Sequence, residues 1–369
     1  MHRRVVLLSV VALAVAGATV PAQAGTTSSP GPVGWSGAGT SSERRTVMEY
    51  WTPERMRAAR PLSAPAPRRG TSSGGPTQGT PWATRGVTGT RRITTSSWTG
   101  GTASSPHTGG TATSPHTGGT AASTRAGGTA AAARQAAPVQ NSPGQAWADG
   151  GGVVRTVGRV FFTTAEGRTA SCSGTAVTSA NESVVMTAGH CVKLNGAAHR
   201  NWVFVPGFAD GRRPFGTWVA TRLLTTQQWN TNEDINFDVA AVVVAPLQGR
   251  TLTAVVGGQG VAFNQPTGRQ MFSFGYPAAD PFDGSDLVFC SGKAFKDPVR
   301  TRDQGLRCAM TGGSSGGPWF EGFDTSTGLG WLNSVNSFKY DFAPDFMFGP
   351  FFGNEAMAVY QAAQRSGAA

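Results

Sequence analysis

A chain of 369 residues can hold one or two domains, and its net charge of +11 at first suggests a nucleic acid or an anionic membrane as partner. Residues 1–151 carry 14 Arg and four acidic side chains, whereas residues 152–369 carry 17 Lys or Arg and 16 acidic side chains. The basic excess thus lies in the first part, and the nearly balanced second part argues against a nucleic-acid partner for a domain folded there.

The chain opens with the pattern of a secretory signal peptide. A basic start (His2, Arg3, Arg4) precedes an apolar run from Val5 to Val20 and the small-residue sequence Ala22-Gln23-Ala24. The apolar run is short for a bilayer span, so we expect cleavage after Ala24 and no membrane association afterwards. The protein is therefore expected to be secreted and extracellular.

Residues 25–147 are predicted to be a pro-region and low-complexity linker. Residues 25–45 are rich in Gly, Ser, Thr and Pro and are expected to be disordered, while residues 46–62 can form a short helix with Pro53 near its start. A nine-residue repeat then begins at Gly100, Gly109 and Gly118. Such a tract lacks the apolar residues that would offset its ordering entropy, so residues 63–147 are interpreted as flexible linker.

Residues 148–369 are predicted to form one mainly β domain. Short β-rich runs are separated by Gly, Asn, Asp and Pro turn signals. The runs are VVRTVGRVFFT, TAVTS, SVVMTAG, WVFVPGF, WVATRLLTT, DVAAVVVA, RQMFSFGYP, DLVFC and WLNSVNSF. Only residues 354–365 show helical spacing, with Asn354 as the expected cap. This pattern favours an antiparallel barrel or sandwich with one terminal helix.

A glycine-rich turn, TGGSSGGP at residues 311–318, is the candidate nucleophile site. Glycine tolerates the dihedrals that let backbone N–H groups converge beside a serine. The string fits G-x-S-x-G on both Ser314 and Ser315, which suggests an α/β-hydrolase. That fold needs a histidine after the serine, and no histidine follows Ser315.

The positions of the histidines select the base. His190 ends an apolar strand in VVMTAGHCV, whereas His199 lies in the polar loop NGAAHRN, so His190 is the better partner for a serine. Asp238 opens the apolar run DVAAVVVA, where a carboxylate needs a partner. Asp234, in the polar stretch NEDIN, is interpreted as a surface acid. The resulting order is His190, Asp238, Ser315.

Four cysteines follow the leader: Cys172, Cys191, Cys290 and Cys308. An even number in a secreted chain predicts disulfides, with three possible connectivities. Pairing 172 with 191 and 290 with 308 would close two short loops. No C-x-x-C or His-x-x-x-His spacing accompanies them, so neither a zinc site nor another metal or cofactor is expected.

TAGHC around His190, FDVA with Asp238 and GGSSGGP with Ser315 together resemble the trypsin-like, chymotrypsin-fold serine proteases over residues 152–365. CSGTAV and the GYP at 275–277 are similar to bacterial secreted members, including the group with the glutamyl endopeptidases. The resemblance implies two six-stranded antiparallel β-barrels, an oxyanion hole from the N–H groups of Gly313 and Ser315, and a Cys172–Cys191 bridge.

The resemblance also places the substrate pocket and shows one departure. Ala309 is expected near the pocket base and residues 334–338 along its wall, including Ser334, Asn336 and Ser337. A non-acidic Ala309 argues against a preference for Lys or Arg. Ser314 stands where members activated by inserting a new N-terminus have Asp. We therefore expect leader removal, with Arg125 or Arg134 as candidate sites, to unmask the domain without building the oxyanion hole.

The sequence thus predicts a monomeric, secreted serine endopeptidase acting on peptides or proteins. Two alternatives remain at this point. One is a non-catalytic binding protein on the same fold, and the other is a wall-binding or adhesive protein displayed through the repeats.

Overall fold

The computed structural model describes residues 31–64, 67, 74–89 and 141–368. The predicted signal peptide, the repeats, Arg125 and Arg134 lie outside these residues. None of the described helices has the length and hydropathy needed to cross a membrane.

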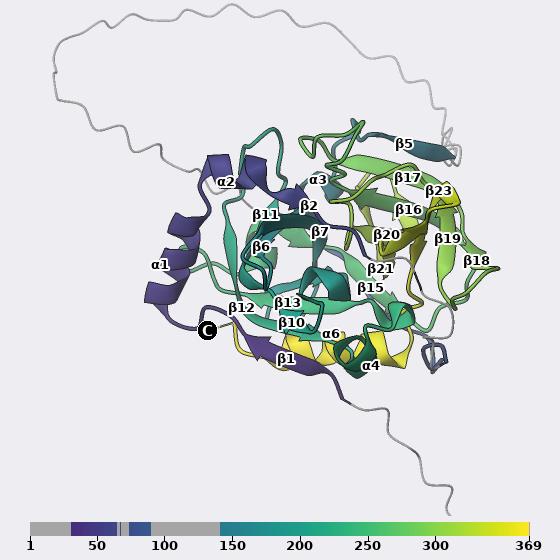
Figure 1. The fold of residues 1–369 in the computed structure, drawn as a ribbon, viewed down its shortest axis with the longest axis horizontal. Helices are drawn as coiled ribbons and strands as arrows, with labels where there is room; N and C mark the ends of the chain where they lie inside the picture. Colours follow the sequence, from purple (N-terminus) through teal and green to yellow (C-terminus); the bar gives the residue numbers. More distant parts are fainter. Residues whose placement is uncertain (1–30, 65–66, 68–73, 90–140, 369) are drawn as a thin grey trace, which may run out of the picture. The chain divides into compact units, whose positions relative to one another are not determined.

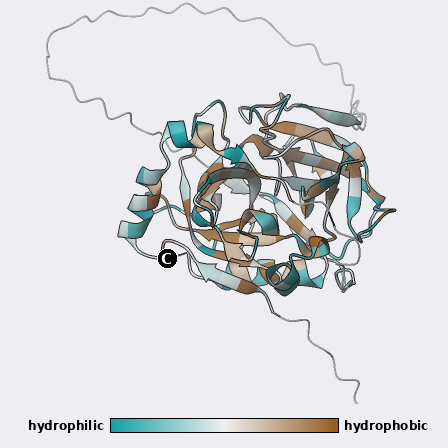
Figure 2. Cartoon of the chain, viewed as in Figure 1, coloured by the Kyte–Doolittle hydropathy of each residue, from teal (hydrophilic) through white to brown (hydrophobic). Residues whose placement is uncertain are grey.

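The first half of the folded domain is a closed six-stranded antiparallel barrel (Figure 1). Its strands follow one another around the ring as β12, β11, β6, β7, β8 and β13, and β13 pairs back onto β12. They span β6 (Val157–Thr163), β7 (Thr169–Val177), β8 (Val184–Thr187), β11 (Arg200–Pro206), β12 (Trp218–Thr225) and β13 (Ala240–Val244). All residues of β6, β8 and β13 are buried, because both faces of these strands are covered. Figure 2 shows the hydrophobic residues gathered along these strands.

The second half is also mainly β and consists of two sheets, where the resemblance to the chymotrypsin-fold proteases implied a second six-stranded barrel. A seven-stranded sheet has the order β3, β15, β21, β20, β16, β17, β5. Its strands are β3 (Trp82–Thr84), β15 (Gly260–Phe263), β21 (Leu329–Val335), β20 (Pro318–Asp324), β16 (Gln270–Gly275), β17 (Val288–Lys293) and β5 (Ser142–Ala146). A four-stranded sheet comprises β18 (Phe295–Lys296), β19 (Gln304–Arg307), β23 (Ala343–Gly349) and β22 (Phe338–Tyr340).

Outside the leader, the remaining described helices and short strands lie between these strands along the chain or after the last of them. They are α3 (Val153–Thr156), η1 (Gly189–Cys191), β9 (Lys193–Leu194), β10 (Ala197–Ala198), α4 (Gln227–Asn232), η2 (Ile235–Phe237), α5 (Leu252–Val256), β14 (Gly257–Gly258) and α6 (Asn354–Arg365). The terminal helix has the predicted bounds, but Gly353 and not Asn354 is its N-cap. It packs against β13 and β12, and the Tyr360 hydroxyl donates to the Thr178 carbonyl at 2.6 Å.

The leader differs most from the sequence interpretation. Its described residues form β1 (Val33–Ser36), α1 (Ser41–Tyr50), α2 (Pro53–Ala58), β2 (Arg60–Pro61) and β4 (Val87–Thr88), in addition to β3. Thr40 and Glu43 form a capping box on α1, and Pro53 is the first residue of α2, where a missing N–H costs nothing. β1 pairs with β12 of the barrel. Segments judged disordered or flexible therefore add strands to the folded domain.

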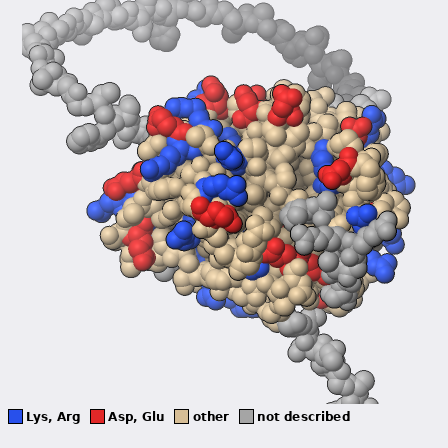
Figure 3. Space-filling model, viewed as in Figure 1, with Lys and Arg blue, Asp and Glu red and all other residues tan. Residues whose placement is uncertain are grey.

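The domain also begins earlier than residue 148. β5 pairs with β17, and the Trp147 side chain is buried against the rings of Phe274, Phe289 and Phe323. The face drawn in Figure 3 carries acidic and basic side chains interspersed, as expected from the balanced charge of residues 152–369.

Candidate active site

His190 lies in the one-turn helix η1, directly after the buried strand β8. A Cβ on the preceding Gly189 would come within 2.7 Å of the Trp229 ring, so only glycine lets the turn approach that ring. His190 has no solvent-exposed surface. Two further groups hold its turn: His199 Nε2 donates to the His190 carbonyl at 3.0 Å, and Trp202 Nε1 donates to the Cys191 carbonyl at 3.0 Å.

Asp238 reaches His190 because of the pairing between β13 and β8. Ala240 is registered opposite Thr187, so the residues just before one strand and just after the other lie together. Asp238 Oδ1 accepts the His190 backbone N–H at 2.8 Å, and Oδ2 lies 2.8 Å from His190 Nδ1. Oδ2 also accepts from Ser337 Oγ at 2.5 Å. The fully buried carboxylate is thus surrounded by three donors, which is how a buried charge is tolerated.

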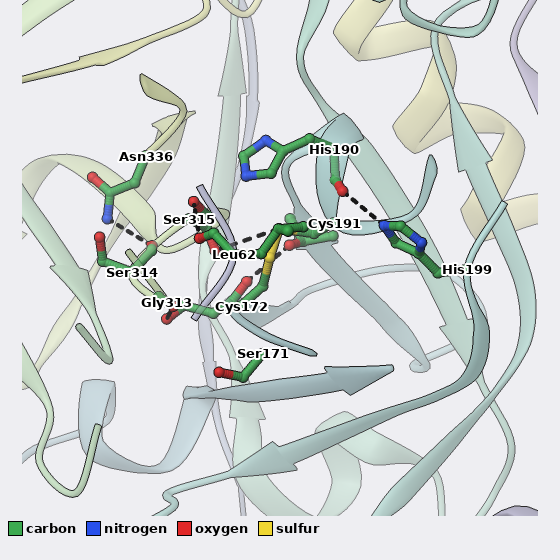
Figure 4. Close-up of a disulfide and its surroundings, with 12 residues drawn as sticks. Leu62, Ser171, Cys172, His190, Cys191, His199, Gly313, Ser314, Ser315 and Asn336 are labelled. Carbon is green, nitrogen blue, oxygen red and sulfur yellow. Dashed lines mark hydrogen bonds between the residues drawn. A yellow bond between two sulfur atoms is a disulfide. The ribbon is translucent and has the colours of Figure 1, made fainter. Parts of the chain in front are cut away.

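Ser315 enters from the second half of the domain on the turn before β20. The Ser173 N–H on β7 donates to the Ser315 carbonyl at 2.7 Å, and the same carbonyl lies 3.7 Å from Cys191 Sγ (Figure 4). The serine turn is therefore joined to the first barrel beside the His190 turn. Gly316 has φ +76°, and a Cβ there would meet Thr187 Oγ1 at 2.1 Å, so glycine is required for this contact.

The geometry separates the two serines that the motif left equivalent. Ser314 Oγ donates to the Thr311 carbonyl at 2.7 Å, within its own turn. Ser315 Oγ instead donates to the carbonyl of Leu62 in the leader at 3.2 Å. No hydrogen bond joins Ser315 to His190, and the buried His190 Nε2 has no hydrogen-bond partner among the described residues.

The serine turn is held by Asn336, whose side chain is fully buried. Its Nδ2 donates to the carbonyls of Ser314 (3.1 Å) and Phe274 (3.0 Å). Its Oδ1 accepts from Ser273 Oγ and Trp319 Nε1, both at 2.7 Å. Sequence reasoning placed Asn336 in the substrate pocket and missed this support, because nothing in WLNSVNSF distinguishes an amide that faces a pocket from one bonded inside.

The other residues assigned to the pocket fall in different surroundings. Ser334 is buried and donates to the Pro350 carbonyl at 2.8 Å, and Ser337 bonds Asp238 as described above. Ala309 is exposed, and its N–H donates to the Pro143 carbonyl at 2.6 Å. The side-chain hydroxyls of Ser334 and Ser337 are thus used within the protein.

His199 and Asp234 also differ from their sequence interpretations. The His199 ring stacks on Phe162 with centroids 4.2 Å apart, and burial lowers its pKa to about 4, assisted by the nearby His190. It stays neutral and donates through Nε2. Asp234, expected at the surface, is only 2% exposed; it caps η2, and its carboxylate accepts from the N–H and Nδ2 of Asn236.

Both cysteine pairs are bonded in the structure, Cys172 to Cys191 and Cys290 to Cys308. Cys172 lies on β7 and Cys191 follows His190, so the first bridge ties the histidine turn to the strand that contacts Ser315. Among the described residues, the one His/Cys/Asp/Glu group with metal-like spacing is Cys172, His190 and Cys191. Its sulfurs are in the disulfide and are not available as thiolate ligands.

Comparison with known proteins gives consistent matches to proteases. Residues 172–325 match the family model of the trypsin-like peptidase domain. The protease Anisep from Arthrobacter nicotinovorans is 43% identical, with a TM-score of 0.56, over 60% of this chain and 100% of that chain. The thermostable serine protease AL20 from an extremophilic microorganism is 42% identical, with a TM-score of 0.55, over 58% of this chain and 100% of that chain.

A more distant match is a Glu endopeptidase in complex with MPD. It is 16% identical over 61% of this chain and 98% of that chain, with a TM-score of 0.48. This similarity is too low to carry an argument about substrate preference. No curated protein matches the sequence.

Proposed function

Because the chain belongs to the trypsin-like peptidase family and is a serine endopeptidase, we propose that Ser315, His190 and Asp238 are its catalytic triad and that it acts as a secreted monomer. The observation that carries this proposal is the buried Asp238 carboxylate, which receives both the backbone N–H and the ring Nδ1 of His190. Such a pair orients an imidazole and stabilises its protonated form.

The proposed reaction proceeds through an acyl-enzyme. His190 Nε2 takes the proton of the Ser315 hydroxyl as Oγ attacks the peptide carbonyl, and His190 then protonates the leaving amine. In the second half of the reaction, water attacks the acyl-enzyme while His190 takes its proton. His190 then returns this proton to Ser315, and the carboxylic acid product is released. The backbone N–H groups of Gly313 and Ser315 are assigned to the oxyanion, and the positive φ of Gly313 (+92°) supports this role because a side chain would be strained there.

Ser337 is assigned to the Asp238 carboxylate and not to the substrate. Its hydroxyl donates to the same oxygen that faces His190 Nδ1, so it helps to hold the carboxylate in place beside the imidazole. Ala309 remains the candidate for the pocket base. An uncharged alanine there predicts a preference other than Lys or Arg at the position before the cleaved bond, and cleavage of a peptide library measures it.

Secretion is supported by the chain's first residues and its cysteines. The signal-peptide pattern of residues 1–24 and the two disulfides agree with an oxidising compartment. N-terminal sequencing of the protein from culture medium tests this assignment. A first residue at or before Ala24 would overturn the predicted cleavage.

An active-site probe tests the catalytic assignment. A fluorophosphonate should label the processed protein at Ser315, and labelling should disappear in Ser315→Ala. The matched control is Ser314→Ala, which removes the neighbouring hydroxyl and should still be labelled. Labelling that persists in Ser315→Ala, or processed protein that never reacts, would refute the triad.

A further inference from the structure

A short segment of the leader crosses the proposed catalytic centre. We call residues 60–64 the strap. Its first two residues form β2, which lies parallel to β7 with Arg60 opposite Ala170 and Pro61 opposite Ser171. The next N–H, that of Leu62, donates to the Ser171 carbonyl at 3.0 Å. The strap therefore docks by backbone hydrogen bonds onto the strand that carries Cys172, in the manner of an added β-strand.

The Leu62 carbonyl occupies the position assigned to the oxyanion. It accepts the N–H of Gly313 at 3.0 Å and the hydroxyl of Ser315 at 3.2 Å (Figure 4). Gly313 N–H is one of the two donors proposed to stabilise the tetrahedral intermediate. Because the Leu62 carbonyl already accepts the Gly313 N–H, a substrate carbonyl cannot bind in the proposed oxyanion hole while the strap is docked.

The same contact keeps the nucleophile from its base. Attack requires the Ser315 proton to pass to His190 Nε2, yet the hydroxyl is donated to Leu62 and Nε2 has no partner among the described residues. While the strap is bound, Ser315 and His190 therefore share no hydrogen bond. This arrangement blocks the centre without presenting the Leu62–Ser63 bond for proton-coupled attack.

The serine turn is shaped to admit the strap. A Cβ at Gly312 would have only strap atoms as its three nearest neighbours: Ser63 Oγ at 2.7 Å, Pro61 Cβ at 3.4 Å and the Leu62 oxygen at 3.7 Å. No positive φ requires glycine at this position. The space left by Gly312 is therefore filled by the strap.

The rest of the leader anchors the strap to the first barrel. β1 pairs with β12 from Val33 opposite Thr225 to Ser36 opposite Arg222. Trp51 is 1% exposed, lies against the Phe161 ring and donates its indole N–H to the Asn201 carbonyl at 2.6 Å. An anchor so placed holds the strap at a high effective concentration beside the catalytic centre.

We propose that residues 31–64 are an inhibitor of the protease within its own chain, acting through the Leu62 carbonyl in the oxyanion hole. The inference rests on the proposed triad. The crystallised chains of two relatives are matched over their whole length and align with 60% and 58% of this chain, so the leader lies outside the part that those chains share with it. Cutting the chain after residue 64 would not by itself free the site, because the leader stays docked until it dissociates or is degraded.

The first test measures how fast a fluorophosphonate labels Ser315 in the full-length, uncut chain. Trp51→Ala removes the main anchor and should raise the labelling rate at least about tenfold, as loss of a buried aromatic anchor does at interfaces. Met48→Ala is the matched control, because this side chain lies on α1, three residues before Trp51, but is 43% exposed, and it should label at the wild-type rate. Equal rates for the wild type, Trp51→Ala and fully processed enzyme would overturn the inhibitor.

The second test does not depend on how the Trp51 variant folds. A synthetic peptide of residues 31–64, added to processed enzyme, should slow labelling in proportion to its concentration, whereas a scrambled peptide should not. Gly312→Ala should weaken this inhibition at least about tenfold, because its Cβ collides with the strap. A peptide without effect overturns the inference while labelling of Ser315 still supports the protease; absence of labelling in every form instead refutes the triad.

Discussion

The Asn336 amide offers the sharpest test of how the serine turn is held. In Asn336→Ala, the Trp319 indole N–H and the Ser273 hydroxyl lose the one hydrogen-bond partner that each has in the described part of the chain, and both side chains are fully buried. Each unsatisfied buried group costs about 1–3 kcal/mol, so the free energy of unfolding should fall by about 2–6 kcal/mol. For a domain of this size, about 2–4 °C is lost per kcal/mol, which predicts a Tm at least about 4 °C lower.

Calorimetry in a Ser315→Ala background avoids self-digestion and measures this loss directly. Asn232→Ala, an exposed amide at the end of α4, is the matched control and should leave Tm nearly unchanged. The same Asn336→Ala change in the active chain should slow fluorophosphonate labelling, since Nδ2 no longer holds the Ser314 carbonyl. A Tm and a labelling rate equal to those of the control would refute the assigned role.

Three further predictions concern the histidine side of the site. Ser337→Ala removes a donor to the Asp238 carboxylate and should lower kcat by about tenfold or more with KM little changed, whereas Ser326→Ala on an exposed turn should alter neither. Burial lowers the His199 pKa from 6.5 to about 4, so the unfolded chain binds the extra proton and stability should decline by about 3 kcal/mol as pH falls from 6.5 through 4. His199→Phe should flatten that part of the Tm–pH curve, and an unchanged slope would exclude His199 as its source. Replacing both Cys172 and Cys191 by Ala should cost about 2–5 kcal/mol and also lower kcat, while the same change at Cys290 and Cys308 should affect mainly Tm.

Residue order made the main features of the first barrel and its histidine turn predictable. The apolar runs around β8 and β13 are continuous because those strands are buried on both faces, and His190 and Asp238 stand at their ends. The terminal helix was equally predictable from the sequence. Its apolar residues recur at helical spacing on one face, and this face is buried in the structure: Ala356, Val359, Tyr360 and Ala363. These are local sequence patterns, and such patterns predict the structure correctly where the tertiary contacts favour the same conformation.

What could not be predicted depends on contacts between distant segments. Asn336, Ser337 and His199 are ordinary polar residues in sequence, and only the packing of β21, η1 and β11 reveals which groups they bond. The leader was misjudged for a related reason. Its strands β1 (VGWS) and β3 (WAT) are only four and three residues long, and they are stabilised by pairing with β12 and β15 rather than by a core of their own.

Ser314, the residue before the proposed nucleophile, connects these observations. Ser314 cannot form the buried ion pair that Asp makes with an inserted N-terminus, so a chain of this kind needs another way to hold its oxyanion turn. Asn336 provides one from inside the second half of the domain: its side-chain Nδ2 donates to the Ser314 carbonyl, and its backbone carbonyl accepts the Gly316 N–H at 2.7 Å. The turn is thus already formed in the uncut chain, as the Gly313 N–H bonded to Leu62 indicates. The proposed oxyanion hole is therefore held in shape by Asn336 before any cleavage, and in the proposed inhibitor the Leu62 carbonyl of the strap fills it.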